Sequence, residues 1–197
     1  MVCEVLTEPA ADALYFWALQ VGFSGGGAAH TGLQWLPATA GVRRAVNWGG
    51  YRSGGGELDG SVSPLPSIDG NPNTRAFSWE TGAPHRLVVS RGERGWLASV
   101  DGVTIRELWA PGPFLQDPVV WSEVFARCDD PQVVVRWSDL AAVTDDGRTL
   151  RPVSLSVNYQ SHRDGGCDNT DVMVDDVGVC QVTNTERSVA QGTVLRR

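Results

Sequence analysis

The clearest pattern of apolar and polar positions lies in residues 14–36, where two apolar, aromatic-rich segments flank a glycine turn. Residues 14–23 and 29–36 favour β-strands, and the glycines at 25–27 give the backbone the freedom that a tight turn requires. Neither segment contains Lys, Arg, Asp or Glu. Because strands buried on both faces form uncharged apolar runs, we predict that this hairpin lies inside a sheet rather than at its edge.

Short β-favouring segments continue along the rest of the chain and are separated by turn residues. Apolar and polar positions alternate cleanly in several of them, and no segment longer than about ten residues keeps a helical period. The strands predicted beyond the hairpin are residues 42–51, 75–80, 85–91, 95–100, 103–109, 119–127, 133–137, 153–160 and 177–183. We therefore predict an all-β protein in which about eleven strands form two antiparallel sheets, a sandwich of the jelly-roll type.

Composition and charge limit the classes of function. A chain of 197 residues with 42% hydrophobic content can bury one full core, so we treat residues 1–197 as a single domain. The net charge of −7 argues against a nucleic-acid partner, because no basic stripe is present to release counterions from phosphates. All 16 basic residues are Arg, which excludes Schiff-base chemistry on lysine. No apolar run approaches the roughly 18 residues of a membrane span. The oligomeric state stays open.

The four cysteines are Cys3, Cys128, Cys167 and Cys180, and they lack the CxxC spacing of a zinc site. We favour a disulfide between Cys128 and Cys167, because both follow strand-like segments and enter loops rich in Asp. A bridge between Cys167 and Cys180 is one alternative, and a set of free thiols is the other.

Two stretches are predicted to be long loops, residues 53–74 and residues 161–176. The first is rich in Gly and Pro, and the second is acidic. Asp168, Asp171 and Asp175 in the second loop are weak candidate ligands for a structural Ca²⁺, which takes several oxygen ligands. Because the ligand spacing of an EF-hand is absent, solvated loop acids are the simpler interpretation, and no cofactor is expected.

The aromatic residues suggest a ligand site. Eight Trp residues would crowd the core of a sandwich this size, so we expect about two or three of them at the surface or in a cleft. Trp48 is the strongest candidate, because it lies at a predicted strand end beside residues 53–74, with Tyr51 and Arg52 close by. Trp109 is the second, at a junction between a strand and a loop.

The second long loop is preceded by the sequence VNYQSHR, which carries amide and guanidinium groups. Long loops of a jelly roll commonly overhang the concave sheet, so we predict that this segment faces the first loop across a groove. Asn158, Gln160 and Asp164 are the residues expected to contact the ligand there. A mixture of rings, amides and charged groups is what recognition of a sugar requires.

Residues 85–108, HRLVVSRGERGWLASVDGVTIREL, are similar to the strand meander of concanavalin-like lectin and glucanase domains. Three further blocks together resemble a family of uncharacterised bacterial proteins that are mostly exported and frequent in actinobacteria. These blocks are YFWALQVGFSGGGAAHTGLQW, VVWSEVFARCDDPQVVVRWSDL and VNYQSHRDGGCDNTDVMVDDVGVCQVTNTER. The resemblance implies a concanavalin-like jelly roll and a secreted protein, and it implies no activity. A cytoplasmic location is the alternative, because the sequence MVCEVLTEPA lacks the features of a signal peptide.

These observations favour a β-sandwich that binds carbohydrate, or another small molecule, without covalent chemistry. One alternative is an enzyme of the lyase or cyclase type that uses a pocket within the sandwich. A glycoside hydrolase is the second alternative, because such enzymes need a pair of carboxyl groups. The E-x-D-x-x-E strand motif of the glucanases is absent, and the nearest acidic candidates are Glu57 with Asp59, Glu80 and Glu123. No catalytic residue is predicted.

Overall fold

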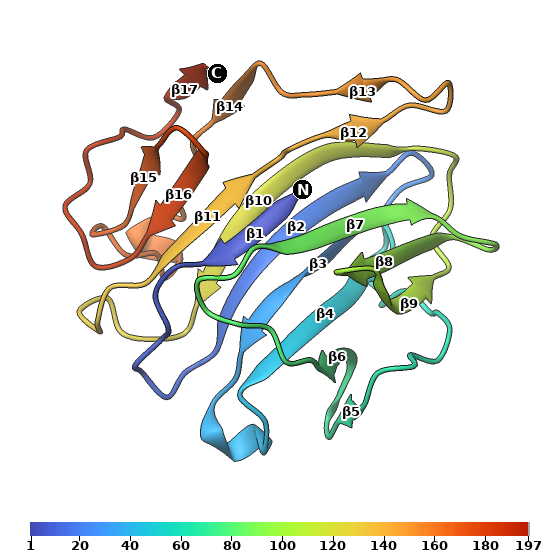
Figure 1. Cartoon of the computed structure of the whole chain (residues 1–197), viewed down its shortest axis with the longest axis horizontal. Helices are drawn as coiled ribbons and strands as arrows, with labels where there is room; N and C mark the ends of the chain where they lie inside the picture. Colours follow the sequence, from blue (N-terminus) through green and yellow to red (C-terminus); the bar gives the residue numbers. More distant parts are fainter. Residues whose placement is uncertain (197) are drawn as a thin grey trace.

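The protein is an antiparallel β-sandwich, seen in a computed structural model that describes residues 1–196. Two large sheets face each other (Figure 1), and we call them sheet A and sheet B. In spatial order, sheet A contains β15 (Asp171–Val174), β16 (Gly178–Val182), β11 (Val134–Ser138), β1 (Val2–Val5), β7 (His85–Arg91), β8 (Trp96–Val100) and β9 (Val103–Leu108). Sheet B contains β10 (Leu115–Val124), β2 (Tyr15–Phe23), β3 (Ala28–Trp35), β4 (Arg44–Tyr51), β6 (Asn71–Ala76) and β5 (Ser67–Ile68).

The remaining elements are short. Two further strand pairs lie outside the main sheets, β12 (Ala142–Val143) with β13 (Thr149–Leu150) and β14 (Ser154–Ser156) with β17 (Val194–Arg196). Two 3₁₀ helices, η1 (Ala38–Ala40) and η2 (His162–Asp164), are the helical elements within residues 1–196. The predicted all-β, two-sheet antiparallel sandwich is therefore confirmed. No helix in this part of the chain is long and apolar enough to cross a membrane.

The hairpin of residues 14–36 occupies the interior of sheet B, as its uncharged pattern predicts. Strand β2 pairs with β10 on one side and β3 on the other, and β3 also pairs with β4. The turn between them depends on Gly26 and Gly27, whose φ angles of 96° and 86° are in the left-handed region that favours glycine.

Several predicted element boundaries are wrong. Residues 53–74 are not one long loop, because they contain β5 and the start of β6. Residues 161–176 contain η2 and β15. Of the predicted strand at 153–160, only Ser154–Ser156 is a strand. Strand β1 lies between β11 and β7 in sheet A. The sequence did not predict it, because a four-residue segment is too short to show a clear alternation.

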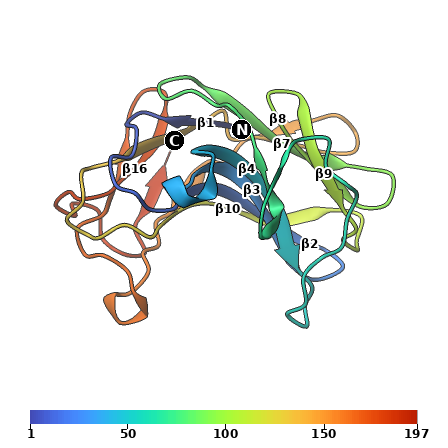
Figure 2. The same cartoon turned by 90° about the horizontal axis from the view of Figure 1, so that it is seen from below.

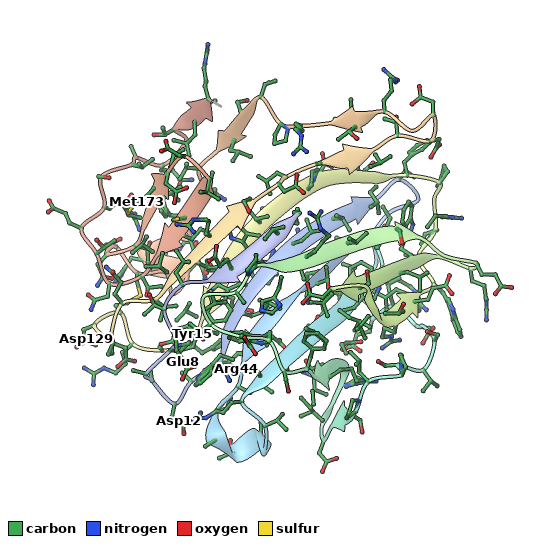
Figure 3. All side chains as sticks on the ribbon, in the orientation of Figure 1. Glu8, Asp12, Tyr15, Arg44, Asp129 and Met173 are labelled. Carbon is green, nitrogen blue, oxygen red and sulfur yellow. A yellow bond between two sulfur atoms is a disulfide. The ribbon has the colours of Figure 1, made fainter. Side chains whose placement is uncertain are left out.

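The core between the two sheets is rich in indole rings. Trp17, Trp48, Trp79 and Trp137 are its largest fully buried side chains. Trp17 and Trp79 pack edge to face with their ring centroids 5.8 Å apart. Arg44 lies over the rings of Trp35 and Trp79 and forms an ion pair with Glu8; the two labelled side chains lie just below the centre of Figure 3.

The predicted disulfide is confirmed. Cys128 and Cys167 are bonded, and their Cα atoms are 5.6 Å apart, within the range typical of disulfides. Cys3 and Cys180 are free and buried, so neither of the alternative arrangements is present. The bond joins the segment that follows β10 to the segment that precedes β15.

Sheet B is curved, and its face turned away from sheet A is concave (Figure 2). The tight turn after β4 projects below the sheet at one end of this arch, and η2 projects at the other end. We call the concave face the outer face of sheet B, because the opposite face packs on the core.

Candidate functional site

The outer face of sheet B contains a groove of about 600 Å³. One row of paired residues shows its cross-section. In this row Trp121 on β10 lies opposite Ala18 on β2, Ala18 opposite Gly32 on β3, Gly32 opposite Asn47 on β4, and Asn47 opposite Thr74 on β6. Directly paired residues place their side chains on the same face of a sheet. The groove therefore has a large ring on one side and polar groups on the other, and the strands between them carry two small, buried residues in this row. We call it the outer groove.

Three rings form the aromatic wall of the outer groove. Phe16, His30 and Trp121 pack edge to face around one another, with ring centroids 5.1 Å apart for Phe16 and Trp121, 5.5 Å for Phe16 and His30, and 5.7 Å for His30 and Trp121. Phe16 is buried beneath its neighbours, whereas His30 and Trp121 are partly exposed to the groove. The packing fixes the orientation of the accessible rings before any ligand binds.

The polar wall is a hydrogen-bonded chain of side chains. Asn47 Nδ2 donates to Thr74 Oγ1 at 3.1 Å, and Thr74 Oγ1 donates to Gln34 Oε1 at 3.0 Å. Because the hydroxyl proton of Thr74 is used for Gln34, the amide of Asn47 must present its NH₂ group to Thr74. Asn47 Oδ1 is buried and has no hydrogen-bond partner within residues 1–196. This wall thus carries an unused acceptor next to the groove.

The polar wall is extended by Asn73 on β6. Gly49 on β4 leaves room for this side chain, because a Cβ atom on Gly49 would lie 2.7 Å from Asn73 Cγ. Arg106 from β9 reaches the same residue, and its Nη1 donates to Asn73 Oδ1 at 3.0 Å and to the carbonyl oxygen of Pro72 at 3.3 Å. Arg106 is itself buried, so it supports the wall from behind.

Exposed rings lie at the two ends of the outer groove. Tyr51, at the end of β4, is 51% exposed, and Phe125, just after β10, is 65% exposed. Eight residues of β2 and its N-terminal extension separate the two ends, a distance of about 27 Å along the strand. The outer groove is therefore long enough for an extended ligand.

Burial changes the ionisation of two groups in the groove. It lowers the pKa of His30 below its usual value, so the imidazole is neutral at pH 7. It also raises the pKa of the Glu123 carboxyl group. Neither group has an ion-pair partner within residues 1–196.

Of the predicted ligand-binding residues, Tyr51 is the one that lines the outer groove. The prediction for Trp48 is wrong, because its ring is fully buried in the core and its Nε1 donates to the carbonyl oxygen of Trp96 at 3.1 Å. Alternation along β4 explains this difference, since Trp48 faces the core while its neighbours Asn47 and Gly49 face outward.

Arg52 and Trp109 lie near each other but outside the lining of the groove. Arg52 forms an ion pair with Asp59, and the backbone NH of Trp109 donates to the carbonyl oxygen of the same residue. Trp109 is partly exposed, and the guanidinium of Arg94 stacks 3.9 Å from its ring centroid.

The structure does not bring Asn158, Gln160 and Asp164 to Tyr51. The segment that carries them lies at the end of the molecule opposite the turn after β4 (Figures 1 and 2). Each of these residues is engaged locally, Asn158 with Gln191, and Gln160 with the backbone of Asp164. The two loops therefore do not face each other across a groove, and the site predicted between them is not formed.

The three weak calcium candidates do not converge either. Asp171 accepts hydrogen bonds from Ser188 and Val189, whereas Asp175 pairs with Arg136. Within residues 1–196 there is no cluster of three or more His, Cys, Asp or Glu side chains that could hold a metal ion.

Sequence reasoning missed Phe16, His30, Gln34 and Trp121, although a signal for two of them was present. His30 and Gln34 are polar residues in the largely apolar hairpin, and they lie four positions apart on β3. A period of two places these residues on one face of the strand and Leu33 on the other. The side chains that line the groove could thus have been separated from those of the core.

No protein-family model matches this sequence, and no curated protein is similar enough to match it.

Proposed function

We propose that this protein binds carbohydrate in the outer groove and performs no covalent chemistry on it. The observation that carries the proposal is the row in which Trp121 faces Asn47 across the small residues Ala18 and Gly32. A partly exposed ring stacks on the apolar C–H face of a sugar, and side-chain amides hydrogen-bond to its hydroxyl groups. The two kinds of group lie on opposite walls, so a glycan lying in the groove can contact both.

Preorganisation also supports this proposal. The ring of Trp121 is held by Phe16 and His30, and the amide of Asn47 is held by Thr74. Side chains that are already ordered lose little conformational entropy when a ligand binds. Rigid walls of this kind suit a binding site for a flexible, strongly hydrated oligosaccharide.

The glycoside-hydrolase alternative is less well supported. Two carboxylates line the outer groove, Glu123 on β10 and Glu57 beside the end of β4. Three strand spacings of about 4.8 Å separate β10 from β4, which puts these two groups at least about 14 Å apart. Hydrolysis by paired carboxyl groups requires separations of about 5–9.5 Å. The other nearby acid, Asp59, is paired with Arg52.

A lyase or cyclase with a pocket inside the sandwich is also less well supported. The space between the sheets is occupied by fully buried side chains, among them Trp17, Trp48 and Trp79. The indole NH groups of Trp48 and Trp79 donate to backbone carbonyl oxygens, so these rings serve the core.

We further propose a concanavalin-like jelly roll from an exported family, on the strength of the sequence resemblance. The disulfide between Cys128 and Cys167 supports export, because disulfides persist in oxidising compartments.

The proposal is tested by calorimetric titration with neutral and acidic oligosaccharides, using Trp121→Ala and Trp109→Ala as matched variants. Both rings are partly exposed, but only Trp121 lines the groove. We expect Trp121→Ala to weaken binding by at least about tenfold, as loss of a stacking ring typically costs 1–3 kcal/mol. Trp109→Ala should change the affinity by less than about twofold. If no oligosaccharide binds at millimolar concentration, or if both variants bind as the wild type does, carbohydrate binding in this groove is wrong.

A further inference from the structure

We propose that the ligand of the outer groove is an uncharged glycan that presents hydroxyl donors to the polar wall, and that uronate-containing and sulfated glycans are excluded. The inference rests on the proposed function and narrows it to one chemical class of ligand. It is carried by the charges around the groove and by the direction of its hydrogen bonds.

The ionisable side chains that line the outer groove carry negative charge or none. They are Glu57, Glu123, His30 and Tyr51, and no Arg or Lys is among the lining residues. The imidazole of His30 sits among the rings of Phe16 and Trp121, a setting that disfavours the imidazolium form. An anionic ligand would therefore meet two carboxylates and no free cation.

Two guanidinium groups near the groove are already used. Arg106 is buried, and its Nη1 donates to Asn73 Oδ1 and to the carbonyl oxygen of Pro72. Arg52 is paired with Asp59. Proteins that select carboxylate or sulfate groups present a guanidinium or an ammonium group to the anion, commonly as a bidentate pair with Arg. Neither arginine is presented to the groove in that way.

The hydrogen bonds of the polar wall point in one direction. Donation runs from Asn47 to Thr74 and from Thr74 to Gln34, and it leaves Asn47 Oδ1 as a buried acceptor without a partner within residues 1–196. Asn47 is 95% buried, since only 5% of its surface is exposed. A buried acceptor is satisfied by a donor, and a sugar hydroxyl supplies one, whereas a carboxylate or sulfate oxygen supplies only another acceptor.

The whole molecule adds to this selectivity. Its net charge of −7 repels polyanions at a distance, and the effect is strongest at low ionic strength. A neutral glycan experiences no such repulsion, so its affinity is expected to be nearly independent of salt.

The test compares hexasaccharides that differ only in charge. Neutral β-1,4-glucan, β-1,3-glucan and β-1,4-mannan hexasaccharides are titrated by calorimetry beside the same sugars oxidised at C6 to carboxylates. We expect at least one neutral hexasaccharide to bind and its oxidised counterpart to bind at least tenfold more weakly. This difference in affinity should become smaller in high salt. The variant Glu57→Gln/Glu123→Gln keeps the size of both side chains and should narrow the ratio of the two affinities at low salt.

The outcomes separate the two proposals. If an oxidised sugar binds as tightly as its neutral counterpart or more tightly, and Trp121→Ala abolishes that binding, the groove binds carbohydrate but the charge selectivity is wrong. If the ratio of the affinities for the neutral and the oxidised sugar at low salt is the same in the Glu57→Gln/Glu123→Gln variant as in the wild type, the proposed charge selectivity is also wrong. If neither form of any sugar binds at millimolar concentration, the proposed function fails and this inference fails with it.

Discussion

The Asp171 carboxylate ties the C-terminal segment to strand β15. Its Oδ2 accepts hydrogen bonds from the backbone NH and the hydroxyl of Ser188, at 3.0 Å and 2.6 Å. Its Oδ1 accepts from the backbone NH of Val189 at 3.0 Å and from the hydroxyl of Tyr159 at 3.3 Å. Burial alone would raise the pKa of Asp171, but the hydrogen bonds from Ser188 and Val189 outweigh it and lower the pKa to about 2.

A depressed pKa in the folded state makes the stability depend on pH. The carboxylate of Asp171 contributes about 2 kcal/mol to the free energy of unfolding above its unfolded pKa of about 3.9, and this is lost as the pH falls towards 2. We predict that Asp171→Asn lowers the free energy of unfolding by about that amount at pH 7 and by much less at pH 2. Urea denaturation at several pH values measures the difference, with the exposed Asp168→Asn as the control. A difference that is independent of pH would contradict this role of the carboxylate.

Individual residue types were poor guides to the ligand site. Trp48 has the sequence neighbours of a binding residue yet faces the core, whereas Trp121 lines the groove. Both side chains lie on strands of sheet B, so residue type and strand location do not distinguish them. The two residues differ in the face of the sheet on which their side chains lie, and that face depends on the register of the strand.

At the scale of elements, the close approach of β2 and β3 depends on Gly32. A Cβ atom at this position would lie 1.9 Å from the carbonyl oxygen of Trp17 and 2.8 Å from the Cα of Ala18. Both contacts are with backbone, which cannot swing aside as the end of a flexible side chain can. The absence of a side chain therefore sets the spacing of the two strands.

We predict that Gly32→Ala lowers the free energy of unfolding by about 1–3 kcal/mol, because the strands must shift to admit the methyl group. Chemical denaturation measures the change. Gly54→Ala is the matched control, since a Cβ atom there would have no neighbour within 4 Å, and its effect should stay within about 0.5 kcal/mol. Equal effects of the two substitutions would show that the contact with Trp17 does not constrain β2 and β3.

At the scale of the whole molecule, the disulfide connects the two sheets at the end away from Tyr51. It links the segment after β10 of sheet B to the segment before β15 of sheet A, across 39 positions of sequence. The same region is held by Arg187, whose Nη2 donates to the carbonyl oxygen of Cys167 at 2.7 Å. Neither cysteine lines the outer groove, although Phe125 at one end of the groove lies three residues before Cys128.

We predict that Cys128→Ser/Cys167→Ser lowers the free energy of unfolding by up to about 4 kcal/mol, the value expected from chain entropy for a loop of this length. The affinity for a glycan bound in the outer groove should change by less than about twofold, because neither cysteine lines the groove. Thermal unfolding and calorimetric titration of the same variant measure both quantities. A large loss of affinity in a folded variant would indicate that the site extends to the disulfide.

The sequence by itself determined the all-β class, the two antiparallel sheets and the interior position of the 14–36 hairpin. It favoured the pairing of Cys128 with Cys167 but left two alternatives open, and the structure decided between them. These features depend on local pattern, since uncharged alternating segments form strands and glycines form the turn between them. Short strands such as β1 and β15 escaped prediction, because long-range pairing within a sheet stabilises them rather than their own pattern.

Only the tertiary structure decided where a ligand could bind. The row from Trp121 to Thr74 joins residues 18, 32, 47, 74 and 121, which are brought together by the register of five strands. A shift of one residue in any of these pairings would turn that strand's groove residues towards the core. The alternation within one strand separates its two faces, but it does not say which residues of other strands lie beside them. The groove therefore depends on the assembly of the sheet, whereas the sequence of each segment already favours a strand.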